Sequence, residues 1–350
     1  MSVPNGRAPT LASVAASAGV SVATVSKVLN GRDDVGAETR ARVQALLEQH
    51  HYVGRGSGAA GLAPDGRPTV ELVVHGELSG YFLNVLEGVL DAGADAGVTV
   101  AVSVRARPKP GAGGKRSSAW VRNLAKLGRI AVIDVVDDLR HGDLSALIRG
   151  PLPLVVIDPL NLPRREVNSV GTTNFAGGLV ATGHLLSLGH SRIAYVGAEA
   201  APAAAYNQAR MHGYRAALAT AGIAETEAYV RRGRSQYEDG IVEGGILLDL
   251  AQPPTAVFAA TDETAAGVIE AARLRKLRVP EDVSVVGFDD TPIARLLSPP
   301  LTTVRQPLRE MGRVALLTAL RVAAGEDPAS YHVELATELV VRGSTAPPTR

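Results

Sequence analysis

The chain has 350 residues, a formal net charge of +1 at pH 7 and no cysteine. This length suits two or three domains rather than one, and the lack of cysteine excludes disulfides and thiolate chemistry. No apolar run approaches the roughly 20 residues that span a bilayer, and the first residues lack the apolar core of a secretion signal. We therefore expect a cytoplasmic protein without membrane contact.

The segment from Thr10 to Asn30 is typical of two short helices joined by a tight turn. Thr10 and Ser21 stand where N-cap oxygens belong, and Gly19 lets the chain reverse without a steric penalty. Apolar residues recur at helical spacing in both halves, namely Leu11, Val14, Ala15, Val25, Val28 and Leu29. This pattern predicts a helix-turn-helix, whose second helix can enter the major groove of DNA.

The second helix of this motif begins with small side chains that can face bases and phosphates, starting with Ser21. Val22 and Ala23 lack hydrogen-bonding groups, so they can only touch thymine methyl groups or shape the fit. Polar readout therefore falls to the side chains that follow, Thr24, Ser26 and Lys27. A helix-turn-helix used only for packing is the alternative.

A third amphipathic helix is expected over residues 38–49, where Val43, Leu46 and Leu47 would close a small core with the first two helices. Val35 should fill the same core from the preceding loop. Residues 1–61 carry six Lys or Arg side chains and four acidic ones. This mild excess predicts modest phosphate attraction, so tight DNA binding would need two such heads.

Residues 54–68 are rich in Gly and Pro and indicate a linker. From Thr69 onward, short β-branched runs alternate with helical stretches at 82–96, 174–188, 203–221, 237–250 and 262–276. Such alternation is typical of parallel sheets with helices on both faces, and the length suits two sheets. Ligands in such folds sit beyond the carboxyl ends of the strands.

The loops after predicted strands supply candidate ligand contacts. Tyr81 or Phe82 could stack on an apolar sugar face, or could simply pack on its own domain. Asp262 suits a carboxylate that accepts sugar hydroxyl bonds, although it could also cap the helix at 263–276. Asp289 is favoured over its neighbour Asp290. Two further candidates follow residues 170–173, namely Asn174 and Phe175.

Enzyme and metal chemistry find little support in the sequence. GAGGKR at 111–116 lacks the glycine spacing and the final Ser or Thr of a phosphate-binding loop. His184 and His190 lie close in sequence, but no further His or Cys completes a metal site. No Gly-x-Ser-x-Gly element is present. We therefore expect neither catalysis, nor a cofactor, nor a bound metal.

Several motifs together resemble the lactose-repressor (LacI/GalR) family. The amino-terminal one is AxxAGVSxATVSKVLNG at 15–31, followed by Thr39, Arg40 and Tyr52. The others are TDETAAG at 261–267, VPEDVSVVGFDD at 279–290, PPLTTVRQP at 299–307 and VRGST at 341–345. The resemblance implies a three-helix helix-turn-helix domain followed by a two-lobed α/β receptor of the periplasmic-binding-protein type.

The resemblance also implies a division of the chain. Residues 1–53 would form the DNA-binding domain, 54–68 the hinge or linker and 69–350 the receptor. One lobe would hold about 69–188 and 303–330, and the other about 189–302 and 331–350. A hinge helix of this family inserts a leucine into the minor groove; here only Leu62 is available, and the glycines at 54, 56, 58 and 61 disfavour a helix.

Family positions add site residues to those that the pattern suggests. Arg210 in RMHGY matches an arginine that reaches into the cleft and forks two hydroxyls or a carboxylate. The DNA contacts implied are Thr10, Ser21, Val22, Ala23, Thr24, Ser26, Lys27, Asn30, Thr39 and Leu62.

The expected function is a dimeric, ligand-responsive transcriptional regulator that represses carbohydrate-utilisation genes. Each head would read half of a pseudopalindromic operator, and a sugar in the cleft would cause release. The chief alternative is a sugar-binding protein for transport without a regulatory role, which the helix-turn-helix disfavours. A sugar kinase or dehydrogenase is a second alternative, and it lacks a nucleotide-binding motif.

Overall fold

The computed structural model describes residues 11–29, 35–49, 66–75, 79–105, 118–135, 152–159, 167–198, 205–233, 235–328 and 330–349. Thr10, Asn30, most of the linker and Leu62 lie outside these residues. Among the described helices, none has the length and apolar character needed to cross a membrane.

The amino-terminal head contains the predicted helix-turn-helix. Its helices are α1 (Leu11–Ala18), α2 (Val22–Leu29) and α3 (Ala37–Gln49). The backbone N–H of Thr24 donates to Ser21 Oγ at 3.1 Å, so Ser21 caps α2 as expected. Gly19 has a φ of +65° in the turn, a conformation that glycine adopts without strain. The buried core joins Val14, Val25 and Val43, one from each helix, with Val35 packed against it.

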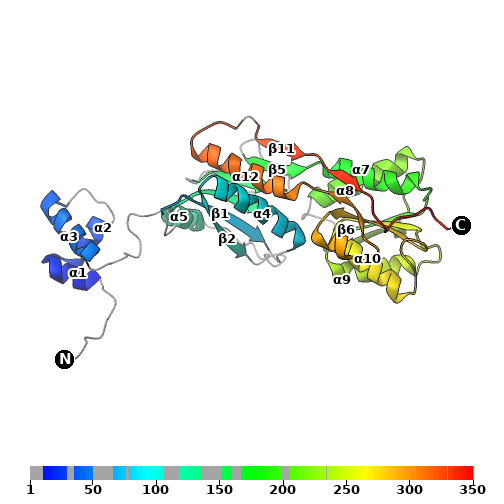
Figure 1. Ribbon diagram of the computed structural model, residues 1–350, viewed down its shortest axis with the longest axis horizontal. Helices are drawn as coiled ribbons and strands as arrows, with labels where there is room; N and C mark the ends of the chain where they lie inside the picture. The colour runs from blue at the N-terminus through cyan, green and yellow to red at the C-terminus, as the bar shows by residue number, and fades with distance from the viewer. Residues whose placement is uncertain are drawn as a thin grey trace, which may run out of the picture.

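In the described residues after the head, two six-stranded sheets form the framework on which the helices pack (Figure 1). The first has the order β11-β5-β4-β3-β1-β2 and is parallel throughout. Its strands are β1 (Thr69–His75), β2 (Thr99–Arg105), β3 (Arg129–Val135), β4 (Leu154–Ile157), β5 (Asn168–Thr172) and β11 (His332–Leu335).

The second sheet has the order β12-β10-β9-β8-β6-β7, and only β12 runs antiparallel to its neighbour. Its strands are β6 (Ile193–Ala198), β7 (Val230–Gly233), β8 (Ala256–Ala259), β9 (Ser284–Asp289), β10 (Thr302–Arg305) and β12 (Glu338–Val340).

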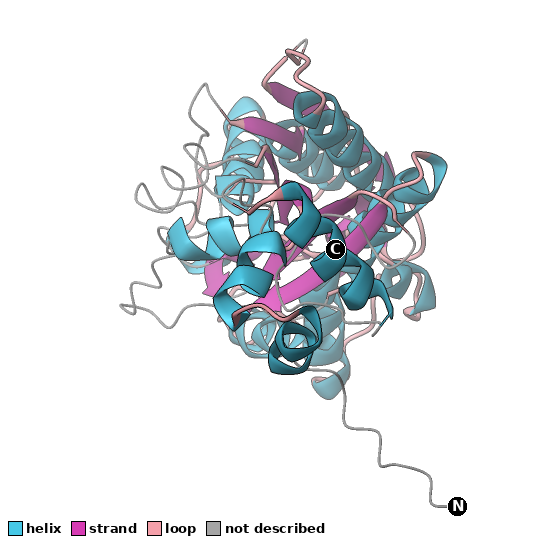
Figure 2. Ribbon diagram, turned by 90° about the vertical axis from the view of Figure 1, so that its left-hand side faces the viewer, coloured by secondary structure: helices cyan, strands magenta, loops and turns pink. Residues whose placement is uncertain are grey.

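Helices cover the strands of both sheets (Figure 2). In the first sheet, α4 (Gly80–Asp95) and α12 (Leu308–Ala323) pack together over one face, and α5 (Ser118–Lys126) packs against the other. In the second, α7 (Asn174–Ser187) pairs with α8 (Ala205–Thr220), and α9 (Tyr237–Leu248) pairs with α10 (Asp262–Leu274). Two short helices are also described, η1 (Glu227–Tyr229) and α11 (Pro292–Leu296).

The chain crosses between the lobes at points that differ from the expected ones. Helix α7 packs on α8 and against the second sheet, so the first crossing is at Thr173 rather than near residue 188. The chain returns after β10, at 306–307, and crosses again at 336–337, between β11 and β12. The structure therefore corrects the expected division. Residues 174–188 and β10 belong to the second lobe rather than the first, and β11 belongs to the first lobe rather than the second.

Paired helices approach so closely that their backbones touch. On α7, a methyl group added to Gly178 would lie 2.2 Å from the carbonyl oxygen of Arg210 on α8. In return, a methyl group at Gly213 on α8 would lie 2.3 Å from the carbonyl oxygen of Phe175. Only glycine permits this close approach. The approach sets the position of α8 relative to α7, and with it the position of Arg210.

Gly178→Ala should therefore destabilise the receptor by about 1–3 kcal/mol, the usual cost of overpacking a tight contact. Gly183→Ala on the same helix is the matched control, because nothing lies within 4 Å of its added methyl group. Alanine favours helix there, so the control should be neutral or stabilising by up to about 1 kcal/mol. Urea unfolding measures both; equal midpoints would contradict the packing account.

Candidate functional site

The exposed face of α2 is the candidate DNA-reading surface. Val22 is 47% exposed, and Ser21, Ala23 and Lys27 are also exposed, whereas Thr24 is half-buried. Thr39 is half-buried on α3. The side chain of Ser26 lies outside the described residues. The head thus presents the side chains that the sequence assigned to base and phosphate contact, and those roles remain predictions.

Arg210 lies at the centre of a polar cluster between the lobes. Its side chain is 2% exposed. Nε donates to Asn174 Oδ1 at 2.8 Å, and Nη1 donates to the carbonyl oxygen of Ala260 at 2.6 Å. The guanidinium carbon lies 3.7 Å from the ring centroid of Phe288 and 5.2 Å from that of Tyr206. Stacking and hydrogen bonds together fix its plane, as recognition of a ligand requires.

A chain of polar contacts runs from Arg210 to the crossing points. Arg210 Nη1 lies 3.4 Å from Asp289 Oδ1, which also accepts a hydrogen bond from Gln306 Nε2 at 2.6 Å. Gln306 Oε1 in turn accepts from Thr172 Oγ1 at 2.5 Å. Thr172 ends β5 in the first lobe, and Gln306 follows β10 of the second. This series of polar contacts therefore connects the candidate ligand site to two of the segments that join the lobes.

The first lobe contributes Tyr81 and Asp158 to the same region. Tyr81 Oη donates to Asp158 Oδ2 at 2.7 Å. Burial, the Asp158 charge and that hydrogen bond raise the pKa of Tyr81 well above its usual value, and Asp289 of the other lobe adds to the effect. Burial also raises the pKa of Asp158, whereas Tyr81 and the charge of Arg210 oppose that rise. Groups of both lobes therefore act on each other across the boundary between the lobes.

The acidic residues after two strands adopt unusual backbone conformations. Asp158, after β4, has a φ of +44°, and Asp289, at the end of β9, has a φ of +115°. Both lie in the region that costs a side-chain-bearing residue free energy, a feature that clusters at binding sites. Asp290, at +57°, is bound by Arg305 and Arg342 instead. This agrees with the choice of Asp289 as the ligand candidate.

Two expected ligand contacts are taken up by other interactions and do not belong to the cluster around Arg210. Phe82 is 3% exposed and belongs to the apolar core of the first lobe, so the packing alternative is correct for it. Asp262 is fully buried, and it accepts hydrogen bonds from Thr303 Oγ1 at 2.5 Å and from both N–H and Oγ1 of Thr291. Its carboxylate holds the second lobe together. Thr261, not Asp262, is the N-cap of α10.

Phe175 is 48% exposed on α7, and the structure does not bring it into the cluster. The structure does bring together Tyr81, Asn174, Arg210 and Asp289. Sequence reasoning missed Asp158, Tyr206 and Gln306. Asp158 was detectable, because it follows the predicted strand LPLVVID as Asp289 follows its own strand. Tyr206 lies four residues before Arg210 on α8, a spacing that places both on one helix face.

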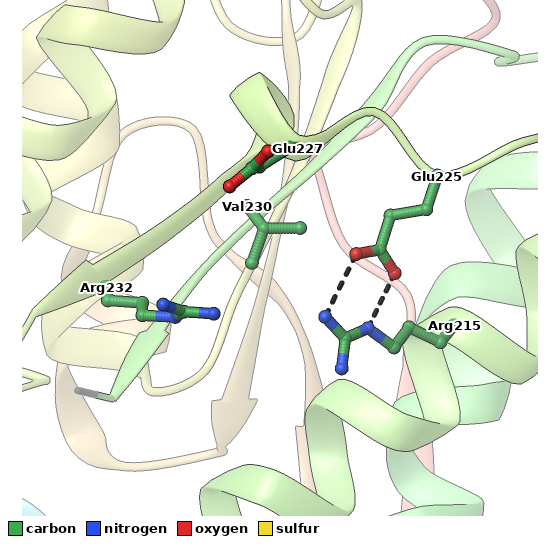
Figure 3. Close-up of a pocket in the computed structure, with 5 residues that line it drawn as sticks. All are labelled: Arg215, Glu225, Glu227, Val230 and Arg232. Atoms are coloured by element: carbon green, nitrogen blue, oxygen red, sulfur yellow. Dashed lines mark hydrogen bonds and ion pairs between the residues drawn. The ribbon is translucent and has the colours of Figure 1, made fainter. Parts of the chain in front are cut away.

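A separate pocket of about 340 Å³ lies near β7, away from this cluster (Figure 3). Arg215 and Glu225 form a two-bond pair across one wall, at 2.6 and 2.9 Å. Glu227 and Arg232 flank Val230 on the other wall. The formal charges of the two acidic and two basic side chains that line the pocket cancel.

Comparison with known proteins agrees with both parts of this architecture. A model described as bacterial regulatory proteins, lacI family, matches residues 10–54, and a periplasmic binding protein-like domain matches residues 182–345. The chain is 33% identical over 343 residues to the HTH-type transcriptional regulator DegA of Bacillus subtilis (strain 168), which covers 97% of this chain and 98% of DegA.

Solved structures share the fold over nearly the whole chain. The complex of the transcriptional regulator CelR with cellobiose has a TM-score of 0.70 and 32% identity, covering 96% of this chain and 99% of CelR. The lac repressor dimer bound to operator and the anti-inducer ONPF has a TM-score of 0.69 and 26% identity, covering 97% of this chain and all of that one (100%).

A DNA-reading head joined to a two-lobed receptor defines a ligand-responsive, DNA-binding regulator of transcription. The chain belongs to the LacI family of bacterial regulatory proteins.

The buried carboxyls of the receptor predict a pH dependence of stability. Burial raises the pKa of Asp262 to about 7, although the hydrogen bonds from Thr303 and Thr291 oppose the rise. An unfolded aspartate has a pKa of about 3.9. The folded protein therefore binds more protons than the unfolded chain in the interval between, and stability falls as pH rises through it.

Thermal unfolding between about pH 4 and pH 8 should show this fall. Asp262→Asn should make it smaller because the amide does not titrate, while Asp158 and Asp289, whose pKa values burial also raises, sustain the rest. Asp95→Asn on the exposed end of α4 is the control and should leave the slope unchanged. An unchanged slope in Asp262→Asn would show that other groups set the pH dependence.

Proposed function

We propose that this protein represses transcription as a homodimer that releases a pseudopalindromic operator when a carbohydrate binds between its lobes. The cluster around Arg210 is the observation that carries the proposal. It combines a fixed guanidinium, the carboxylates of Asp158 and Asp289 and the aromatic rings of Tyr81 and Tyr206. Such a set can pair with the hydroxyls of a sugar and cover its apolar face.

The location of the cluster supports a ligand role. Asp158 and Asp289 stand at the carboxyl ends of β4 and β9, where open α/β sheets bind ligands. The chain of contacts through Gln306 to Thr172 would let a ligand at Arg210 act on the segments that join the lobes. The related CelR structure contains cellobiose. We propose binding rather than catalysis as the role of these residues, and action on DNA in the cytoplasm.

Exposed apolar side chains on the first lobe support a dimer. Strand β2 is the last strand of its sheet, and Val102 and Val104 on it are 44% and 55% exposed. Leu83 and Leu90 are exposed on the neighbouring helix α4. An apolar strand edge of this kind is normally covered in a soluble protein. A dimer through this surface would place two heads side by side for two operator half-sites, as in the lac repressor dimer bound to operator.

The first test concerns the head. The double variant Thr24→Ala, Lys27→Ala should lose operator affinity, because each lost base contact costs about 1–3 kcal/mol. Lys126→Ala, which removes an exposed lysine from α5 of the receptor, is the charge control. Fluorescence anisotropy on an operator fragment measures both. Wild-type affinity in the double variant would refute the assignment of α2.

The second test concerns the cleft. Arg210→Ala should abolish release of the operator by carbohydrates while operator binding persists, since truncating a buried charged partner costs on the order of 2–5 kcal/mol. The probes are a panel of mono- and disaccharides that includes cellobiose. Arg215→Ala on the same helix is the control, because Arg215 lines the separate pocket near β7. The carbohydrate proposal would be contradicted if no sugar released the wild-type protein from the operator. It would also be contradicted if the sugar that releases the wild-type protein released Arg210→Ala as well.

A further inference from the structure

Two threonines join the first and the third of the segments that cross between the lobes. The backbone N–H of Thr337 donates to Thr173 Oγ1 at 3.0 Å, and the two hydroxyl oxygens lie 3.0 Å apart. Thr337 Oγ1 donates to the carbonyl oxygen of Thr173 at 3.4 Å. Because a hydroxyl carries one proton, all three bonds form together when Thr173 Oγ1 donates to Thr337 Oγ1. We call this pair the threonine bridge.

The backbone adds a further bond between the same two crossings. The N–H of Thr173 donates to the carbonyl oxygen of Leu335 at 3.0 Å, where β11 ends. The first crossing is thus fastened to the third by backbone and side chain together.

Thr173 makes the bridge in place of a local interaction. It stands at the N-cap position of α7, where a threonine oxygen normally accepts a bond from the first turn of its own helix. Its side chain makes no such bond, and its oxygen accepts the N–H of Thr337 instead. Where a residue departs from its local preference, a functional role is the usual reason.

The bridge lies beside the cluster around Arg210. A methyl group added to Gly177 of α7 would lie 3.1 Å from Thr337 Oγ1 and 2.7 Å from the ring of Phe288. The hydroxyl of Thr337 and the ring of Phe288 therefore both lie against this one residue. Phe288 is the ring that stacks on the guanidinium of Arg210.

Three consecutive residues of the first crossing connect Arg210 with the other crossings. Thr172 donates to Gln306 of the second crossing, and Thr173 binds the third. Asn174 accepts from Arg210 Nε at 2.8 Å and donates to the carbonyl oxygen of Thr172 at 3.2 Å. The first crossing is therefore the one through which the other two are linked.

We propose that the threonine bridge is a positioning element of the ligand response. It fastens the third crossing to the first, so that the lobes keep a defined relation and a change at Arg210 acts on all three crossings together. Thr173 and Thr337 are positioning residues, because they contact the crossing segments. The inference deepens the proposed function and rests on it for the effector, whereas the effect on the lobes needs no effector.

Four variants isolate the hydroxyl groups. Thr337→Val and Thr173→Val keep a branched side chain of similar shape and remove one hydroxyl each, whereas Thr337→Ser keeps the hydroxyl and should restore wild-type behaviour. Thr182→Val is the matched control on α7, because the Thr182 hydroxyl donates to the carbonyl oxygen of Gly178 within the same helix.

The first measurement is the distance between the lobes in protein without ligand. The chain has no cysteine, so spin labels can be placed at Ala94→Cys on α4 and Ala219→Cys on α8, both exposed. Labelled subunits are diluted into unlabelled ones, and pulsed electron resonance records the distance distribution. Thr337→Val and Thr173→Val should broaden the wild-type distribution, whereas Thr337→Ser and Thr182→Val should not.

The second measurement is the response itself, taken as the ratio of operator Kd with and without the sugar that releases the wild-type protein. Thr337→Val should lower this ratio by about fivefold, the factor that one intramolecular hydrogen bond supplies. Sugar affinity of the free protein, measured by calorimetry, should stay at the wild-type value. The double variant should lower the ratio no further than the single ones, because both remove the same bridge. A merely structural role would lower the melting temperature and leave the ratio unchanged.

Wild-type distance distributions in both Thr337→Val and Thr173→Val would overturn the proposal, as would equal broadening in Thr182→Val. A wild-type ratio in variants with broadened distributions would also overturn it. Circular dichroism checks the fold of each variant, and Thr173→Val decides the question if Thr337→Val unfolds. If no sugar in the panel releases the wild-type protein, the proposed effector class is rejected, and the distances still decide whether the bridge positions the lobes.

Discussion

The burial of one guanidinium, that of Arg210, organises the polar cluster between the lobes. Arg210 is almost inaccessible to water, so its charge is sustained by Asn174, Asp289 and the carbonyl oxygen of Ala260, with the ring of Phe288 against its face. Removing a charge from water is costly unless hydrogen bonds and an opposite charge offset the loss. The groups around Arg210 are therefore fixed in place, and a fixed set of donors and acceptors is what makes a polar ligand site selective.

Close backbone contacts between α7 and α8 hold Arg210 in position. Arg210 lies on α8 at the residue whose carbonyl oxygen touches Gly178 of α7, and Gly213 makes the reciprocal contact one turn later. Glycines make equally close backbone contacts in the other two helix pairs. Gly88 and Gly312 lie between α4 and α12, and Gly240 and Gly267 lie between α9 and α10. Each lobe therefore behaves as a closely packed body. Motion is left to the three crossing segments and to the contacts between the lobes.

Much of this architecture could be predicted from the sequence. The capped turn around Ser21 and Gly19 predicted the head, and β-branched runs predicted most central strands, because both are local signals. The short strands β5, β7, β10, β11 and β12 were not predicted, because pairing with neighbours distant in the sequence holds them rather than a local pattern. The lobe boundary at Thr173 was not predicted for a related reason, because the local sequence of a helix does not indicate which sheet the helix will pack on.

The candidate site also contains both residues that local sequence predicts and residues whose roles depend on tertiary contacts. Asp289 and Tyr81 were identified because they follow strands, and Arg210 because its motif resembles the family. Asp262 follows a strand too, but its carboxylate accepts hydrogen bonds from Thr291 and Thr303. Local sequence does not predict these partners, because both lie far from Asp262 along the chain. Side-chain type and strand position thus predict where a ligand binds, whereas tertiary contacts decide which side chains remain available to it.

The central claim is that ligand binding in the cleft and DNA binding by the head are coupled equilibria. Titration calorimetry tests it most directly, with the sugar that releases the operator measured on free protein and on the protein–operator complex. Coupling is reciprocal, so the sugar should bind the complex more weakly by the same factor by which it weakens operator affinity. Equal sugar affinity for the free and DNA-bound protein would contradict the account.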